Sequence, residues 1–301
     1  MGEFDRSGAG QQIQWYPGHM TKTRRRMEEC LKLVDGVVEI IDARIPLSSR
    51  NPDIDEIVGR KPRIVLLNKA DIADGASTAK WIDFFAAKGA RALACDCKTG
   101  RGLNQFAAEV RKLLADKIEV WKAKGMGGRS IKLMVVGIPN VGKSSFINRM
   151  AKGAKAKVAD KPGVTRGNQW FTIGGGIELL DTPGVLWPKF DDPEVGRKLA
   201  FTGAVKDAVV DIETLTLDLL RYMSRSYPER LCERYKLDSV EGLEPLELME
   251  LIAKKRGMIL RGGDYDYERV SVMLLDEYRA GKLGRITLEQ VNDARSENGG
   301  A

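Results

Sequence analysis

The sequence predicts an α/β fold, in which a doubly wound, mostly parallel sheet is followed by a small all-helical domain. Short apolar runs of strand length alternate with helix-length segments between residues 36 and 150, a pattern typical of parallel sheets. From about residue 207 the apolar residues recur at helical spacing, and strand alternation does not return. A chain of 301 residues has room for two such domains.

The elements of the α/β part are expected in a regular order. Met27, Cys30 and Leu31 lie at helical spacing in a basic segment, which predicts a first helix over 21–35. The expected strands are 36–41, 63–67, 91–94 and 131–136, and the expected helices are 78–88, 103–122 and one that ends at Met150. A polar loop with two prolines follows the first strand, and the glycine-rich residues 125–128 form a flexible joint.

A hairpin and a helical domain complete the predicted organisation. Residues 152–166 form a basic loop, and two short apolar runs around Gly174–Gly176 are expected to pair as a hairpin. The predicted divisions are an N-terminal segment (1–20), an α/β domain (21–190), a connector (191–206), a helical domain (207–290) and a flexible tail (291–301).

Charge is unevenly distributed along the chain. The net charge is +7, from 49 basic and 42 acidic residues. Residues 1–206 carry +12, whereas residues 207–301 carry −5. An excess of positive charge favours a polyanionic partner, which is therefore expected to contact the first two-thirds of the chain.

Composition and cysteine spacing argue against several classes of protein. With 43% hydrophobic and 30% charged residues, wholesale disorder is not expected. The four cysteines contain no CxxC pair, which favours free, at least partly buried thiols over a zinc ribbon or a disulfide framework. No apolar run approaches the roughly 20 residues that cross a bilayer, and the polar start lacks the apolar core of a signal peptide. We therefore expect a cytoplasmic protein without membrane contact.

A phosphate-binding loop is predicted at residues 137–144. This segment, GIPNVGKS, fits the pattern GxxxxGK[ST] between a predicted strand and a predicted helix. Glycine lets backbone N–H groups turn inward around phosphate oxygens, beside the positive end of a helix. Lys143 is expected to reach the β- and γ-phosphates, and the Ser144 hydroxyl to ligate Mg²⁺. The loop residues expected to contact the nucleotide are Asn140, Val141, Gly142, Lys143, Ser144 and Ser145.

Two later segments supply the expected partners of this loop. Residues 179–184 (LLDTPG) form a strand that ends in DxxG. Asp181 is expected to hold Mg²⁺ through water, and the Gly184 N–H to contact the γ-phosphate. Thr165, in the preceding GVT segment, is expected to complete the magnesium shell when triphosphate is bound. Each segment alone is weak evidence, but their order and spacing behind a phosphate loop are a strong signal.

A guanine site is predicted from residues 68–71 (NKAD), which fit NKxD. The carboxylate of Asp71 can accept from both N1–H and the exocyclic amine of guanine, a pair of donors that adenine lacks. Asn68 and Lys69 complete this site. In residues 96–100 (DCKTG), Asp96 and Cys97 replace the serine and alanine usual in the stretch that braces the base in GTPases, so only a backbone role carries over. GTP and GDP are the ligands that these motifs predict.

The order of these motifs is unusual. The base motifs precede the phosphate motifs, the reverse of a Ras-like chain. Circular permutation explains this order, because the ends of a compact domain lie close together and new ends can open in a loop. As a consequence, the segment that senses the γ-phosphate leads directly toward the C-terminal helical domain.

A family resemblance follows from these motifs together with four further segments. The segments are IQWYPGHM (13–20), DARIPLSSRNP (42–52), LLDTPGVLWPKF (179–190) and YPERLCERY (227–235). Over nearly its whole length the chain resembles circularly permuted GTPases of the ribosome biogenesis GTPase A family. The resemblance implies a circularly permuted Ras-like P-loop GTPase domain, GTP hydrolysis during assembly of the large ribosomal subunit, and an RNA-binding helical domain. The implied partners are the large subunit or its precursor, with its ribosomal RNA and proteins, and the chain is expected to be a monomer.

The resemblance also implies which residues act in hydrolysis. Where Ras-like enzymes place a glutamine that orients water, this chain has Val185, which has no polar side-chain atom. His19, the only histidine, matches the family's N-terminal catalytic histidine, and its imidazole can orient or deprotonate water near neutral pH. A structural histidine is the alternative. Asn140 matches the asparagine that ligates K⁺ in potassium-stimulated GTPases, with a turn-stabilising side chain as the alternative.

Basic residues beside the predicted site suggest contact with ribosomal RNA. They are Lys22, Arg24, Arg25, Arg26, Lys152, Lys155, Lys157, Lys161 and Arg166. A solvated face is the alternative for such a run. The acidic helical domain has one basic spot, formed by residues 254–256 and Arg261, so its RNA binding rests on the resemblance.

Two other functions remain open from the sequence. One is a non-catalytic RNA-binding scaffold with GTP as a structural ligand, which Val185 favours and His19 opposes. The other is a signalling GTPase for a protein partner, which would show no salt-sensitive association with RNA.

Overall fold

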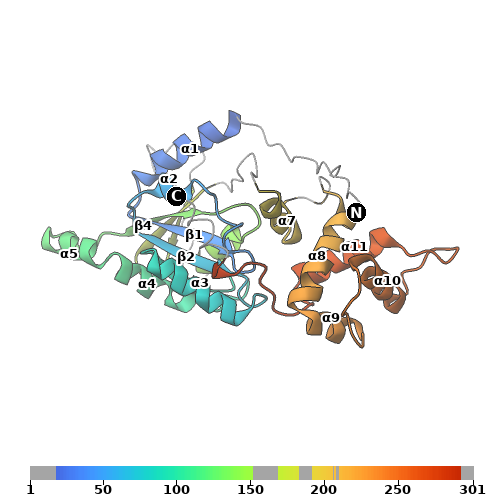
Figure 1. Ribbon diagram of the computed structural model, residues 1–301. Helices are drawn as coiled ribbons and strands as arrows, with labels where there is room; N and C mark the ends of the chain where they lie inside the picture. Colours follow the sequence, from blue (N-terminus) through green and yellow to red (C-terminus); the bar gives the residue numbers. More distant parts are fainter. Residues whose placement is uncertain (1–17, 152–168, 183–191, 206, 208–209, 293–301) are drawn as a thin grey trace.

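Six strands form one sheet in the order β3-β2-β1-β4-β6-β5 in the computed structural model, which describes residues 18–151, 169–182, 192–205, 207 and 210–292 (Figure 1). The strands are β1 (Gly36–Asp42), β2 (Arg63–Asn68), β3 (Arg91–Ala94), β4 (Ile131–Val136), β5 (Gln169–Ile173) and β6 (Ile177–Asp181). Only the hairpin β5–β6 is antiparallel, and all other neighbours are parallel. The predicted mostly parallel sheet and its hairpin are thereby confirmed.

Helices cover both faces of the sheet, as a doubly wound fold requires. They are α1 (Gly18–Leu31), α2 (Ile54–Val58), α3 (Gly75–Ala87), α4 (Phe106–Leu113), α5 (Ala115–Ala123) and α6 (Lys143–Ala151). Alternate residues of each strand face opposite sides. Val37 therefore packs with α1 and α2, and Val65 with α3, whereas Ile40 and its neighbours pack against α4 and α6 on the other face.

Three local elements differ from those expected. The first helix begins at Gly18 and ends at Leu31, before Asp35, because the Asp35 N–H already donates to the Lys132 carbonyl beside the sheet at 2.7 Å. The helix expected over 103–122 is divided at Leu114, where φ is −108° and ψ is 17°. No proline or glycine marks that break in the sequence. A short helix, α2, follows the two-proline loop.

One helix of the helical part lies before the predicted start of the helical domain at residue 207. The helices of this part are α7 (Pro193–Phe201), α8 (Ile212–Ser226), α9 (Pro228–Tyr235), α10 (Pro245–Arg256) and α11 (Tyr267–Arg279). Helix α7 lies within the predicted connector, where Asp192 accepts from the Glu194 N–H and Pro193 begins the helix. Figure 1 shows α7 between the sheet and the other four helices. None of the described helices is long and apolar enough to span a membrane.

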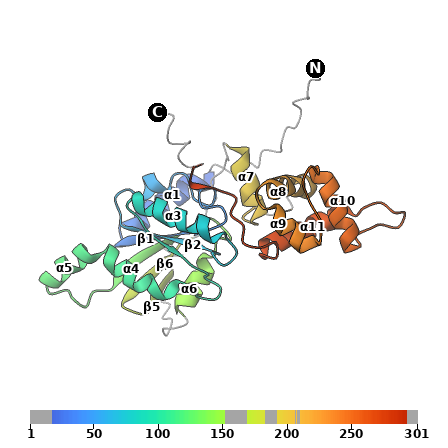
Figure 2. The same cartoon turned by 60° about the horizontal axis from the view of Figure 1, so that its bottom comes forward.

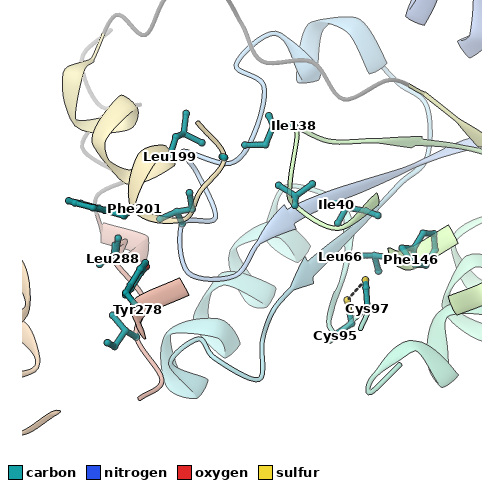
Figure 3. Close-up of a cluster of buried hydrophobic side chains, with 14 of the residues drawn as sticks. Ile40, Leu66, Cys95, Cys97, Ile138, Phe146, Leu199, Phe201, Tyr278 and Leu288 are labelled. Atoms are coloured by element: carbon teal, nitrogen blue, oxygen red, sulfur yellow. Dashed lines mark hydrogen bonds between the residues drawn. The ribbon is translucent and has the colours of Figure 1, made fainter. Parts of the chain in front are cut away.

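The last described residues return to the α/β domain, although the prediction assigned residues up to 290 to the helical domain. The Ile286 N–H donates to the Ile72 carbonyl, and the Leu288 N–H donates to the Arg44 carbonyl. Figure 2 shows this segment crossing from the helical domain toward α3. Leu288 and Tyr278 join one continuous hydrophobic cluster with residues of the sheet, such as Ile40 and Leu66 (Figure 3).

Candidate nucleotide-binding site

The predicted motifs meet at one edge of the sheet. In the registered pairs, Asp42 lies opposite Asn68, Leu67 opposite Ala94, and Val135 opposite Asp181. The strands are parallel, so the segments that follow their carboxyl ends emerge side by side. Ligands of open α/β sheets bind at this edge. The phosphate loop therefore adjoins residues 68–71, although 65 residues separate the two segments in the chain.

The glycines of the phosphate loop hold backbone conformations that other residues rarely adopt. Gly137 has φ 152° and Gly142 has φ 108°. A Cβ on Gly137 would lie 2.5 Å from the Ile40 carbonyl oxygen, and one on Gly142 would clash with the Asn68 amide nitrogen. Helix α6 begins at Lys143, so the loop leads directly into a helix N-terminus, the end of a helix that favours phosphate.

Lys143 is bound by its own loop. Its ammonium group donates to the carbonyl oxygens of Gly137 and Ile138, each at 2.8 Å. Burial lowers the pKa of Lys143 to about 8, although the negative charge of Asp181 acts in the opposite direction. Burial raises the pKa of Asp181, and the charge of Lys143 partly offsets that rise. The charge of each side chain thus affects the pKa of the other.

The oxygen ligands available here suit Mg²⁺. Ser144 is exposed in the first turn of α6, and the half-buried Asp181 ends β6. Hydroxyl and carboxylate oxygens, with several waters and phosphate oxygens, are the ligands that Mg²⁺ takes in nucleotide sites. Ser145 is exposed beside Ser144. The described residues therefore fit a magnesium ion that arrives with the nucleotide.

Asn68 connects the base motifs to the phosphate loop. Its amide nitrogen donates to the Val141 carbonyl at 2.6 Å, and its amide oxygen accepts from the Cys97 N–H at 2.8 Å. The Cys97 N–H thus holds the Asn68 side chain, and the backbone contact of Cys97 with the base stays a prediction. The Cys97 thiol lies 3.7 Å from that of Cys95 in the buried cluster of Figure 3. The four cysteines all lie in described parts of the chain and form no disulfide, as predicted.

The side chains of the predicted base site differ in how they are held. Asp71 is exposed and available to a ligand. Lys69 has a left-handed backbone, with φ 61°, and its ammonium group lies 2.9 Å from the Asp42 carboxylate. Asp96 instead braces its own loop: its carboxylate accepts from the Lys98 N–H at 2.8 Å and from the Thr99 hydroxyl at 2.5 Å. The partners of Asp96 are thus local.

Asn140 joins the phosphate loop to the segment after α7. Its backbone is left-handed, with φ 62°, and its amide nitrogen donates to the Gly203 carbonyl at 2.8 Å. The donating nitrogen is therefore already engaged, and the amide oxygen is the atom that has the chemistry of a cation ligand.

Some predicted residues lie outside what the structure describes. Thr165 falls in the range 152–168, and Gly184 and Val185 fall in the range 183–191. For His19, the structure describes the backbone alone, which lies in the first turn of α1. Their roles remain predictions.

The sequence reasoning missed two charged residues that adjoin the site. Asp42 ends β1 and contacts Lys69, and Arg44 contacts Asp42. Both belong to the DAR sequence at the start of the loop 42–52, which served above as a family signature without a role. Two opposite charges directly after a buried apolar strand were the signal available.

Comparisons with known proteins agree with this geometry. Residues 132–239 match the family model described as "50S ribosome-binding GTPase". That range begins in β4 and leaves out residues 68–71, which is the result expected when the base motifs precede the phosphate loop. The chain is 50% identical over 277 residues to ribosome biogenesis GTPase A of Bacillus cereus, covering 92% of this chain and 93% of that protein.

The chain belongs to the ribosome biogenesis GTPase A family. Solved structures of YlqF from Thermotoga maritima have the same fold: the GDP-bound form has a TM-score of 0.59 at 30% identity, over 89% of this chain and 100% of that one. The GNP-bound form has a TM-score of 0.60 at 29% identity, over 89% and 98% of the two chains. The chain is thus a GTPase of large-subunit assembly that binds GTP and GDP, and the large ribosomal subunit is its partner.

Proposed function

We propose that this GTPase binds the precursor of the large ribosomal subunit in its GTP state, through ribosomal RNA and ribosomal proteins, and leaves after hydrolysis. The observation that supports this cycle is the Asn140–Gly203 hydrogen bond, which connects the phosphate loop to the segment between α7 and α8. A change at the phosphates thereby has a direct path to the helical domain. The subunit precursor would meet the protein in the cytoplasm, where we propose that it acts as a monomer.

The nucleotide is held by the residues of the two motif groups in this proposal. The guanine site consists of Asn68, Lys69 and Asp71, with the backbone of residues 96 and 97. The phosphate site consists of residues 140–145 with Thr165 and Gly184. Ser144, Thr165 and Asp181 would hold Mg²⁺, and Asn140 would ligate K⁺ through its amide oxygen. Bound there, the two cations would offset negative charge on the phosphates.

Hydrolysis depends on His19 in this proposal, because Val185 has no atom that can orient a water. His19 lies in the first turn of α1, and the same helix carries Arg24 and Arg25. RNA that held this helix would also fix the position of the imidazole. Arg25 is exposed, whereas Arg24 is paired with Glu28 at 3.2 Å and Glu56 at 2.5 Å. An RNA phosphate must compete with these two carboxylates for Arg24.

The proposal is tested by GTP turnover with and without isolated large subunits, in K⁺ and in Na⁺. The wild type should be stimulated by subunits, and more strongly in K⁺. His19→Ala should bind GTP normally and lose most of the stimulated rate, about 100-fold, because general acid–base help is typically of that size or larger. Its low basal rate should change little.

Two results would contradict parts of this proposal. Stimulated turnover in His19→Ala equal to that of the wild type would remove His19 from hydrolysis. Absence of any turnover with subunits, combined with tight GTP binding, would favour the scaffold function that Val185 suggests. Association with subunits should weaken steeply as salt is raised, because basic residues displace counterions from RNA. Salt-independent association would argue against RNA contact by the basic residues.

A further inference from the structure

Asp42 is a buried carboxylate at the edge of the guanine site. It ends β1, lies in register with Asn68, and its side chain is 2% exposed. One of its oxygens accepts from the backbone N–H and the Nε of Arg44, each at 3.0 Å. The other accepts from the Arg44 Nη2 at 2.8 Å and lies 2.9 Å from the Lys69 ammonium group. A single buried anion therefore holds two cations.

Arg44 fixes the orientation of this carboxylate. Its side chain is 1% exposed, and its guanidinium group lies 5.1 Å from the centre of the Tyr278 ring in α11. Burial would lower the pKa of Arg44, but the charge of Asp42 and, more weakly, that of Asp71 raise it. Burial would likewise raise the pKa of Asp42, but Arg44 and Lys69 hold it well below its usual range. The carboxylate is thus charged at neutral pH and cannot rotate freely.

The position of the Lys69 side chain depends on this anion. The side chain is 26% exposed, so without Asp42 its ammonium group would extend into water, where it is strongly hydrated. Its backbone has φ 61°, a conformation that side chains with a Cβ rarely adopt. In the chain, Lys69 lies between Asn68, whose side chain donates to the phosphate loop, and Asp71, which is exposed. The Asp42 ion pair restrains a charged side chain that lies between these two base-site residues.

We propose that Asp42 is a positioning residue for guanine recognition, which holds the Lys69 side chain along the base pocket so that its methylene groups form an apolar wall beside the base. Arg44 is the second positioning residue, because it holds Asp42 from the side of the helical domain. This inference rests on the guanine site proposed above. It predicts an effect on guanine nucleotides that does not depend on the number of phosphates.

The test measures the Kd of fluorescently labelled GDP and GTP for Asp42→Asn, Lys69→Met and the double variant. Asp42→Asn should weaken GDP and GTP about tenfold each, with their ratio unchanged, since both share the base. The double variant should bind about as weakly as Lys69→Met alone, because residues that act through one contact are not additive. Additive losses, or a loss confined to GTP, would overturn the proposal.

Glu39→Gln is the matched control for a general effect on folding. Glu39 is also 2% exposed on β1, and it pairs with Arg50 at 2.7 Å and Arg63 at 3.3 Å. Among the described residues its ion-pair partners do not include Lys69, and the substitution should leave GDP affinity unchanged at a comparable loss of stability. Equal losses of affinity in Glu39→Gln and Asp42→Asn would overturn the positioning role.

The GDP affinities of Asp71→Asn and Lys69→Met distinguish a failure of the guanine site from a failure of the positioning role. If Asp71→Asn and Lys69→Met bind GDP like the wild type, the guanine site itself is wrong and the inference falls with it. If these two variants are weakened but Asp42→Asn is not, the guanine site stands and the inference alone is overturned. Should Asp42→Asn fail to fold, a crystal structure of the wild type with GDP decides. A Lys69–Asp42 separation within about 4 Å supports the proposal, and a Lys69 side chain withdrawn from Asp42 overturns it.

Discussion

Lys143 donates to two carbonyl groups of its own loop, and both must be exchanged for phosphate oxygens when a nucleotide binds. Phosphate favours the protonated ammonium group strongly. In the free protein, however, burial lowers the pKa of this group to about 8. Part of the protein therefore carries a neutral lysine slightly above neutral pH. Nucleotide binding must then take up a proton, and affinity becomes linked to pH.

Nucleotide affinity is expected to fall about fourfold between about pH 7 and pH 8.5, because the neutral fraction of Lys143 rises over that range. Isothermal titration with GDP in two buffers of different ionisation enthalpy measures both the affinity and the proton uptake. Lys143→Arg stays protonated throughout and should show no such fall. Wild-type affinity that is flat over this range would contradict the role of Lys143 titration.

The chemistry of single residues was predictable where a loop needs a particular residue type. Gly137 and Gly142 hold positive φ values, and Asn68 fits between two loops, so the pattern of the sequence carries the geometry. The ion pair of Asp42 with Lys69 was not predictable. It depends on the pairing of β1 with β2, which places two residues 27 positions apart in the chain side by side.

At the scale of elements, α7 and α11 are connected by Arg279. Its Nε donates to the Phe201 carbonyl at 3.1 Å and its Nη2 to the Ala200 carbonyl at 2.8 Å, at the C-terminal end of α7. Both terminal nitrogens also bond the Asp207 carboxylate, at 2.8 and 2.6 Å. A cation is favourable at a helix C-terminus, where carbonyl groups lack helical partners. The next residues include Gly203, which Asn140 contacts.

Arg279→Ala should destabilise the protein by about 1–3 kcal/mol, because it leaves carbonyl groups and a carboxylate without their donor. Urea unfolding followed by circular dichroism measures this change. Arg221→Ala is the control: Arg221 is 48% exposed, and its ion pair is a local one with Asp218 in α8. Its loss should change stability by no more than about 0.5 kcal/mol. Equal effects of the two substitutions would show that the contact with α7 contributes nothing.

The positions of the strands could be predicted from local sequence patterns, whereas the points at which helices end or are interrupted could not. The strands at 91–94 and 131–136 lie where they were predicted, because each is a short apolar run bounded by polar residues. The break at Leu114 has no such signal, whereas the start of α7 has one, Asp192 followed by Pro193, which the sequence prediction did not use. The end of α1 at Leu31 is set by the sheet, which takes up the Asp35 backbone, and no residue of α1 itself signals it.

For the whole molecule, the segment 284–292 joins the end of the described chain to the loop after β1. The Glu289 carboxylate accepts from the N–H groups of Leu47 and Ser48 and from the Ser48 hydroxyl, 241 residues away. The Trp81 indole N–H donates to the Glu289 carbonyl at 3.2 Å. Such distant pairing cannot be inferred from local patterns. It explains why periodicity could predict a helical region after the sheet, while the return of the chain to the sheet could not be predicted.

Glu289→Ala should destabilise the whole protein by about 2–4 kcal/mol, since it leaves buried donors at Leu47 and Ser48 without an acceptor. Glu289→Gln keeps one amide oxygen as acceptor and should lose less. Glu233→Ala is the matched control, because Glu233 is 75% exposed and lies 3.6 Å from Arg230. The urea midpoint of each variant, followed by circular dichroism, measures the difference.

If Glu289→Ala unfolds at the same midpoint as Glu233→Ala, the segment 284–292 does not stabilise the contact between the two parts of the molecule. If Glu289→Ala lowers the midpoint and the sheet and the helices still unfold in one transition, the Glu289 carboxylate stabilises both parts of the molecule together.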